Sequence, residues 1–100
     1  MLIMYKVLIT SVAKSDISKI KEYIETRNIN AATNFLNTLF SVLAMLAEYP
    51  NAGVEKSGIK NKDIKIFTVK KKYNIVYRLK GETIEILRVL NKYQNLFAIL

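Results

Sequence analysis

Few residues in this chain could perform acid–base or nucleophilic chemistry. The 100 residues include no histidine and no cysteine. Their absence removes the usual general base near neutral pH, any serine–histidine triad, cysteine nucleophiles, thiolate zinc sites and disulfides. Proton transfer would fall to a lysine or tyrosine with a shifted pKa, or be replaced by electrostatic stabilisation alone. We expect neither a metal site nor a cofactor.

The positive charge is concentrated in one part of the chain. The net charge is +8, and the stretch from Lys56 to Lys80 holds nine basic residues against the single acid Asp63, while the remainder is balanced. This pattern indicates an anionic partner, either nucleic acid or an acidic protein, or else a solubilising lysine-rich surface. The candidate contact residues are Lys62, Lys65, Lys70, Lys71, Lys72, Arg78, Arg88 and Lys92.

Individual residues in this set allow a structural and a functional interpretation. The run Lys70–Lys72 is either a solvated hairpin tip or a contact for phosphates or carboxylates. Arg78 and Arg88 fall on neighbouring predicted strands, where arginine needs an acidic partner such as Glu85 or Glu82, or an anionic ligand. Among the tyrosines we expect three in the core and Tyr93 exposed. The three are Tyr23, Tyr73 and Tyr77.

Length and composition predict one soluble domain covering residues 1–100. A hydrophobic fraction of 51 % is enough for a core, and two separate cores would each be too small to be stable. The first residues lack the basic region of a signal peptide, and no segment is expected to reach the roughly 20 apolar residues that cross a bilayer. A cytoplasmic location is therefore the default.

The first half of the chain predicts a strand and two helices. Alternating apolar residues predict a strand over Tyr5–Thr10, followed by a connector. Helical spacing begins at Asp16, with Ser15 or Asp16 as the N-cap. At the following interruption, Asn28 is expected in the left-handed C-terminal position, and Asn30 as the cap of a second helix over Ala31–Glu48. The short link makes the two helices an antiparallel hairpin.

The second helix carries two apolar rows, although a surface helix of a small domain needs one. It is either sandwiched between the first helix and a sheet, or presents part of its apolar surface to a partner chain. The C-terminal segment 91–100 is likewise either docked on its own domain or a partner contact. The candidate partner-binding apolar residues are Phe40, Leu43, Ala47, Leu96 and Phe97.

Three more strands are predicted over residues 64–69, 73–79 and 83–90, joined by two tight turns, the second of which contains Gly81. Strict alternation in the last strand groups Ile84, Ile86, Arg88 and Leu90 on one face. The fold class is therefore α+β, in the order β-α-α-β-β-β, with the helical hairpin packed on a mainly antiparallel sheet.

Several short stretches match one family pattern in order and spacing. They are the Tyr5–Thr10 strand, Ala13, Asp16-Ile17-x-x-Ile20-x-x-Tyr23-Ile24, Ala32 with Phe35, Leu46 with Pro50 and Gly53, Tyr73–Arg78, and Ile84–Leu90. On these stretches nearly the whole chain resembles the RelE/ParE superfamily of toxins from bacterial toxin–antitoxin modules. The resemblance implies a partly disordered acidic antitoxin as partner, a toxin–antitoxin hetero-oligomer, and one of two activities. RelE-like members cut mRNA on the ribosome, whereas ParE-like members bind and block DNA gyrase.

The basic cleavage set of the RelE-like members is largely missing. Lys65 and Lys92 keep two of its positions, and with Tyr93 they are the candidates for any residual catalysis. The other positions fall on Phe67, on Asn74 and near Ala98, and Asn91 stands where many members have histidine. The long helical hairpin is also more similar to ParE. The resemblance thus favours a ParE-like gyrase inhibitor that acts by binding. The alternatives are an mRNA endonuclease and a non-toxic, antitoxin-binding member.

Overall fold

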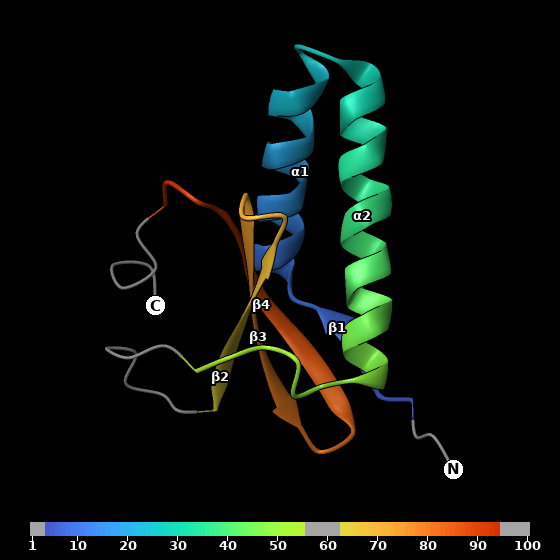
Figure 1. The fold of residues 1–100 in the computed structure, drawn as a ribbon, viewed down its shortest axis with the longest axis vertical. Coiled ribbons are helices and arrows are strands. Elements are labelled where there is room, and N and C mark those ends of the chain that lie inside the picture. Colours follow the sequence, from blue (N-terminus) through green and yellow to red (C-terminus); the bar gives the residue numbers. More distant parts are fainter. Residues whose placement is uncertain (1–3, 56–62, 95–100) are drawn as a thin grey trace.

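The computed structural model describes residues 4–55 and 63–94, in which two helices stand side by side against a four-stranded sheet (Figure 1). The elements are β1 (Lys6–Ile9), α1 (Ser11–Glu25), α2 (Ile29–Glu48), β2 (Ile64–Val69), β3 (Tyr73–Lys80) and β4 (Thr83–Asn91). The predicted α+β class and the order β-α-α-β-β-β are confirmed.

The sheet has the strand order β1-β4-β3-β2. Pairs β2–β3 and β3–β4 are antiparallel hairpins, whereas β1 pairs in parallel with β4, from Lys6 opposite Thr83 to Ile9 opposite Ile86. A parallel pair cannot be joined by a tight turn. Helices α1 and α2 and strands β2 and β3 lie between β1 and β4 in the chain, so the first and last strands of the sequence are neighbours in the sheet.

Helix α1 begins five residues earlier than the predicted start at Asp16. Thr10 is its N-cap, because its Oγ1 accepts a hydrogen bond from the Ala13 amide at 3.2 Å. The same hydroxyl donates to the Ile86 carbonyl of β4 at 2.9 Å, which ties the helix start to the sheet. The predicted connector before Asp16 is thus helical, and Asp16 lies within the helix rather than at its cap.

Helix α2 begins at Ile29 because Asn28 caps it. The Asn28 backbone is extended, with φ −162°, and its Oδ1 accepts from the Ala31 amide at 3.0 Å. The prediction of a left-handed Asn28 and a capping Asn30 was wrong, because a shorter link suffices between antiparallel helices. The predicted end at Glu48, ahead of Pro50, is confirmed.

The main core lies between the helices and one sheet face. Helix α2 contributes Phe35, Leu39, Leu43 and Leu46, and the sheet contributes Ile75, Tyr77, Ile84, Ile86 and Val89. Leu43 and Ala47 are each only 4 % exposed. These two candidate partner-binding residues are therefore part of the core and are not available to a partner. Phe40, which is 51 % exposed, remains on the surface.

The apolar character of α2 follows from this position. By length and composition alone its 20 residues could cross a membrane, contrary to the expectation that no segment could. In this fold, the row that includes Phe35, Leu39 and Leu46 packs on the sheet and α1 instead. A single such helix does not by itself indicate a membrane span, because the core helix of a globular fold meets the same criteria of length and composition.

A β-bulge changes the faces of β4. Val76 pairs with Arg88 and Tyr77 with Ile86, so Leu87 is an extra residue. Past this point the alternation shifts by one: Val89 joins the helix-facing core, while Leu90 packs with Ile66 and Val76 in a second cluster. The predicted grouping of Leu90 with Ile84 was wrong, because strict alternation assumes an unbulged strand.

Candidate functional site

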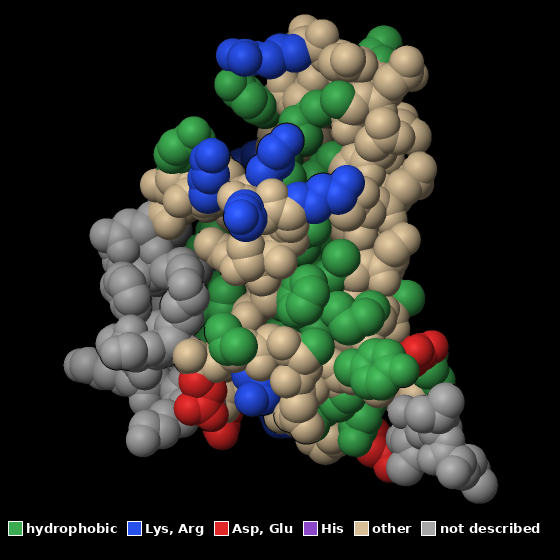
Figure 2. Space-filling model, viewed as in Figure 1, with side chains coloured by type: hydrophobic (Ala, Val, Ile, Leu, Met, Phe, Trp, Pro, Cys, Tyr) green, Lys and Arg blue, Asp and Glu red, His purple; other side chains and the backbone are tan. Residues whose placement is uncertain are grey.

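Five lysines gather at the end of the sheet where β2 ends, β3 begins and β4 ends. Lys70, Lys71 and Lys72 form the β2–β3 turn, Lys92 follows β4, and Lys19 of α1 lines the same pocket as Lys72 and Lys92. We call this set the cationic end. Figure 2 shows blue side chains crowding the region of this turn beside the helices. The Lys92 amide donates to the Lys72 carbonyl at 2.8 Å, so these two backbones are held together.

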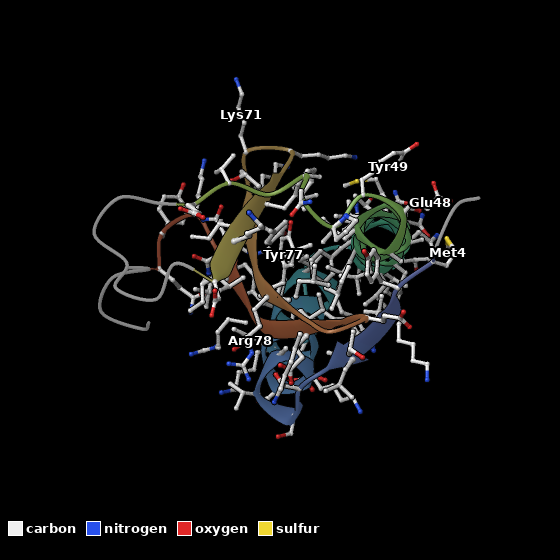
Figure 3. The ribbon with its side chains drawn as sticks, turned by 90° about the horizontal axis from the view of Figure 1, so that it is seen from below. Met4, Glu48, Tyr49, Lys71, Tyr77 and Arg78 are labelled. Atoms are coloured by element: carbon white, nitrogen blue, oxygen red, sulfur yellow. The ribbon has the colours of Figure 1, made fainter. Side chains whose placement is uncertain are left out.

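The turn itself has an unusual backbone. Lys70 and Lys71 have φ values of 51° and 59°, and the Lys72 amide donates to the Val69 carbonyl at 2.9 Å. Positive φ at both central residues suits the twist of a hairpin, but it is normally supplied by asparagine or glycine. Lys71 points away from the body of the molecule (Figure 3). The sequence therefore keeps charge at a position where backbone conformation alone would favour other residues.

An apolar hollow of about 330 Å³ lies beside the turn, between it and the helical hairpin. Phe35, Leu39, Val69 and Tyr73 provide its apolar lining, and the rings of Phe35 and Tyr73 are 4.9 Å apart between centroids. Lys70 and Lys72 also line this hollow. It is thus an apolar surface with positive charge next to it, which suits an acidic amphipathic segment.

A second pocket of about 690 Å³ adjoins the hollow and shares Lys72 and Tyr73 with it. We call it the tyrosine pocket. Its walls come from α1, through Lys19 and Tyr23, and from the segment that follows β4. Of the three tyrosines expected in the core, Tyr23 is the exception at 60 % exposed, while the predicted exposure of Tyr93, at 85 %, is confirmed.

Both arginines of the sheet have carboxylate partners. Arg78 Nε donates to Glu85 Oε1 at 2.7 Å, as one predicted alternative required. Arg88 donates to both Asp16 oxygens, at 2.7 and 2.9 Å, and the bonds to Asp16 raise the pKa of Arg88 above its usual value. The Asp16 partnership was missed, because Asp16 was assigned to a helix cap and lies 72 residues from Arg88.

The candidate catalytic residues do not all lie together. Lys92 Nζ is 5.1 Å from the Tyr93 ring centroid. Lys65, half-buried on β2, is opposite Tyr77, whereas the end of β4 is opposite Tyr73. Tyr77 and Tyr73 are four residues apart on β3, so Lys65 and the end of β4 are separated by about 13 Å along the strand direction. Lys62, Leu96 and Phe97 lie outside the described residues.

Among the described residues of the basic stretch Lys56–Lys80, the charge is divided between the two ends of β3. Lys80 is the last residue of β3, at the opposite end of this strand from Lys72. The basic stretch counted from Lys56 to Lys80 thus included Lys80, which lies apart from the turn lysines, and it did not include Lys19, which α1 brings to them. In the described parts of the chain, no group of three or more carboxylates is placed to hold a metal ion.

The fold is shared with chains of solved toxin–antitoxin structures. A chain of the chromosomal ParDE toxin–antitoxin system from P. aeruginosa superposes with a TM-score of 0.74 at 19 % identity, covering 88 % of this chain and 96 % of that one. A chain of the RelBE2 toxin–antitoxin complex from Mycobacterium tuberculosis gives 0.63 at 20 % identity, covering 88 % and 98 %. The chain therefore has the same fold as these two chains.

The sequence comparisons are more specific. Residues 7–96 match the family described as ParE toxin of the type II toxin–antitoxin system, parDE. Toxin ParE3 of Caulobacter vibrioides is 31 % identical over 96 residues, covering 95 % of this chain and 94 % of that protein. The chain belongs to the ParE toxin family of type II toxin–antitoxin systems.

Proposed function

We propose that this toxin inhibits DNA gyrase by binding it, without cleaving nucleic acid, and that a cognate antitoxin neutralises it. The observation that carries the mechanistic part is the separation of Lys65 from Lys92 and Tyr93 by about 13 Å of strand. A general acid and a general base must both reach one substrate, and these residues are not assembled to do so. Gyrase as the target comes from the family resemblance.

The antitoxin contact is proposed at the apolar hollow and the turn lysines. An extended or helical acidic segment would place apolar side chains on Phe35 and Tyr73 and carboxylates near Lys70 and Lys72. Exposed Phe40 on α2 supplies further apolar surface. The solved relatives whose fold this chain shares are described as a toxin–antitoxin system and a toxin–antitoxin complex, which supports a hetero-oligomer of this kind.

The target is tested with purified protein in two assays, DNA supercoiling by gyrase and cell-free translation. The proposal expects loss of supercoiling and intact mRNA. Phe40→Ala, on the exposed side of the helical hairpin, should weaken inhibition, while Lys65→Ala and Lys92→Ala should have less effect. Translation arrest with position-specific mRNA cuts, and supercoiling left untouched, would contradict the gyrase proposal.

The contact between Lys92 and Tyr93 favours one alternative, an mRNA endonuclease. In that case Lys92→Ala and Tyr93→Phe should abolish cutting while antitoxin binding persists. If neither supercoiling nor translation responds and an acidic partner still copurifies, the chain is a non-toxic antitoxin-binding member. The neighbouring reading frame is the simplest check, because a short acidic protein is expected there.

A further inference from the structure

The tyrosine pocket is lined by lysines, tyrosines and two carboxamide side chains, which together suit one ligand chemistry. Its wall on α1 presents Lys19 and Tyr23, and its opposite wall, after β4, presents Lys92 and Tyr93. Lys72 and Tyr73 separate it from the apolar hollow. At about 690 Å³ it lies in the size range of small-molecule sites.

The pocket is electropositive although Asp16 lines it. The two Asp16 oxygens accept from Arg88 at 2.7 and 2.9 Å, and the Val89 amide donates to the same carboxylate at 3.0 Å. The Arg88 charge therefore offsets that of Asp16. Within the described residues, Lys19, Lys72 and Lys92 form no ion pair, so three positive charges remain for an anion.

Two aromatic side chains of the pocket are largely exposed to solvent. Tyr23 and Tyr93, at 60 % and 85 %, are among the most exposed large apolar residues described, and both line this pocket. Each already carries a cation over its ring, Arg27 at 4.8 Å and Lys92 at 5.1 Å from the centroid. Accessible rings beside cations are the arrangement on which nucleic-acid bases stack while phosphates pair with lysine.

Two carboxamides complete the wall after β4. Gln94 Oε1 accepts from the Asn91 amide at 2.8 Å, and Asn91 Oδ1 accepts from the Tyr93 amide at 2.9 Å. With both oxygens used to hold this turn, the side-chain NH₂ groups have no partner among the described contacts. They are donors available to a phosphate or to a base edge. The turn is also tied to Lys72 through the Lys92 amide.

We propose that the tyrosine pocket binds a nucleoside phosphate, with the phosphate on Lys19, Lys72 and Lys92 and the base stacked on Tyr23 or Tyr93. A free nucleotide and a nucleotide within a single strand share this chemistry. The inference stands apart from the choice of toxin target, because it depends on the pocket alone.

Titration calorimetry at low salt tests the proposal with adenosine monophosphate, inorganic phosphate and a short oligoadenylate. Stacking should make adenosine monophosphate bind at least about fivefold tighter than phosphate. Lys19→Gln should weaken nucleotide binding about threefold, as expected for one exposed charge pair. Tyr23→Leu with Tyr93→Leu should remove the preference for nucleotide over phosphate. Comparable affinity for the monophosphate and the oligoadenylate identifies a free nucleotide, and much tighter oligoadenylate binding identifies a strand.

Control variants distinguish binding at the tyrosine pocket from non-specific attraction to the positive charge of the protein. Lys14 is exposed on the same helix as Lys19 but does not line the pocket. Lys14→Gln should therefore leave nucleotide affinity unchanged. Lys80 is exposed on β3 and also lies outside the pocket, so Lys80→Gln should likewise leave nucleotide affinity unchanged. Equal losses in these controls, equal binding of phosphate and nucleotide, or equally tight binding of polyglutamate would overturn the proposal. So would no detectable binding of any nucleotide by the unaltered protein.

Discussion

Asp16 is the residue that holds α1 to β4. Its carboxylate accepts two bonds from the Arg88 guanidinium and one from the Val89 amide, and its side chain is only 10 % exposed. A paired, planar guanidinium matches both carboxylate oxygens, which a lysine cannot do. The pair therefore fixes the rotation of α1, and with it the direction in which Lys19 and Tyr23 project.

Removing this charge should destabilise the fold. Asp16→Asn leaves Arg88 without its counter-charge, and we expect a loss of about 2 kcal/mol in the free energy of unfolding, measured by urea denaturation. Arg88→Lys should also be destabilising because the bidentate geometry is lost. Glu25→Gln breaks the exposed pair with Lys21, 3.3 Å apart, and should cost less than about 0.5 kcal/mol. An equal loss in the free energy of unfolding for Asp16→Asn and Glu25→Gln would show that the Asp16–Arg88 pair contributes no more to stability than an exposed ion pair.

Tyr77 fastens the loop after α2 to the sheet. Its hydroxyl donates to the Pro50 carbonyl and accepts from the Gly53 amide, both at 2.8 Å, and the ring is fully buried. Figure 3 shows Tyr77 among the side chains between the sheet and α2. A Cβ at Gly53 would lie 2.6 Å from the Tyr77 oxygen. Glycine is thus required here by close approach rather than by backbone conformation.

The burial of the Tyr77 phenol makes the protein sensitive to alkali. Burial raises the pKa of Tyr77, so the folded chain keeps the phenol proton where the unfolded chain has released it. Its stabilising effect is complete below about pH 10 and is lost as pH rises further. Tyr77→Phe should cost about 1–3 kcal/mol near neutrality by leaving buried polar groups unpaired, and should flatten this alkaline decline.

Urea denaturation across pH measures both effects. Burial also raises the pKa of Tyr73, so some decline should remain in the Tyr77→Phe variant. Gly53→Ala should lower stability at all pH values, because its Cβ would collide with the Tyr77 ring and hydroxyl. An unchanged alkaline slope in Tyr77→Phe would mean that other groups govern it.

At the level of elements, the β2–β3 turn shows charge retained against backbone preference. A left-handed conformation costs a non-glycine residue roughly 1–2 kcal/mol, and both Lys70 and Lys71 adopt it. Asparagine and glycine are the residues that such a turn favours. This choice is consistent with the role we propose for the turn in binding an acidic partner.

The turn can therefore be stabilised at the expense of binding. Lys70→Asn with Lys71→Gly should raise the free energy of unfolding by about 1 kcal/mol and weaken antitoxin binding. Thermal denaturation and calorimetry with the antitoxin measure the two changes. Lys72→Asn removes a neighbouring charge without relieving a positive φ, so it should weaken binding but not stabilise. Equal stabilisation by this control would identify charge repulsion, rather than backbone strain, as the cause.

At the scale of the whole molecule, part of the positive charge is gathered at one end of the sheet. The net charge is +8, and five of the described lysines form the cationic end, while Arg78 and Arg88 are compensated by carboxylates. A local positive field of this kind speeds encounter with an acidic partner and weakens as salt rises. The apolar hollow beside it would then supply contacts that salt does not affect.

Binding of the antitoxin should reflect both contributions. Lys70→Glu with Lys72→Glu should slow association and reduce its salt dependence, measured by stopped-flow over a range of salt concentrations. Lys80→Glu, at the other end of β3, changes the net charge without touching the cationic end and should have a smaller effect. If all reversals act in proportion to net charge alone, the cationic end is not a contact surface.

Local patterns predicted much of the fold correctly. The spacing of apolar residues located both helices and all four strands, and the end of α2 followed from Pro50. The errors lay where contacts between residues far apart in the sequence determine the local structure. Thr10 caps α1 while it is bonded to Ile86, and the pairing between β3 and β4 makes Leu87 the additional residue of a β-bulge. Of the site, the turn lysines were evident and Lys19 was not, because its neighbours are far along the chain.

The sequence by itself determined the class of fold, the lack of histidine and cysteine chemistry, the excess of positive charge and the family resemblance. These depend on composition and on spacing between near neighbours, which a single chain displays directly. Only the tertiary structure decided that Asp16 neutralises Arg88, that Lys65 lies apart from Lys92, and that Tyr23 and Tyr93 face one pocket. Such relations arise when elements pack and strands pair, and no local pattern encodes the register in which they do so.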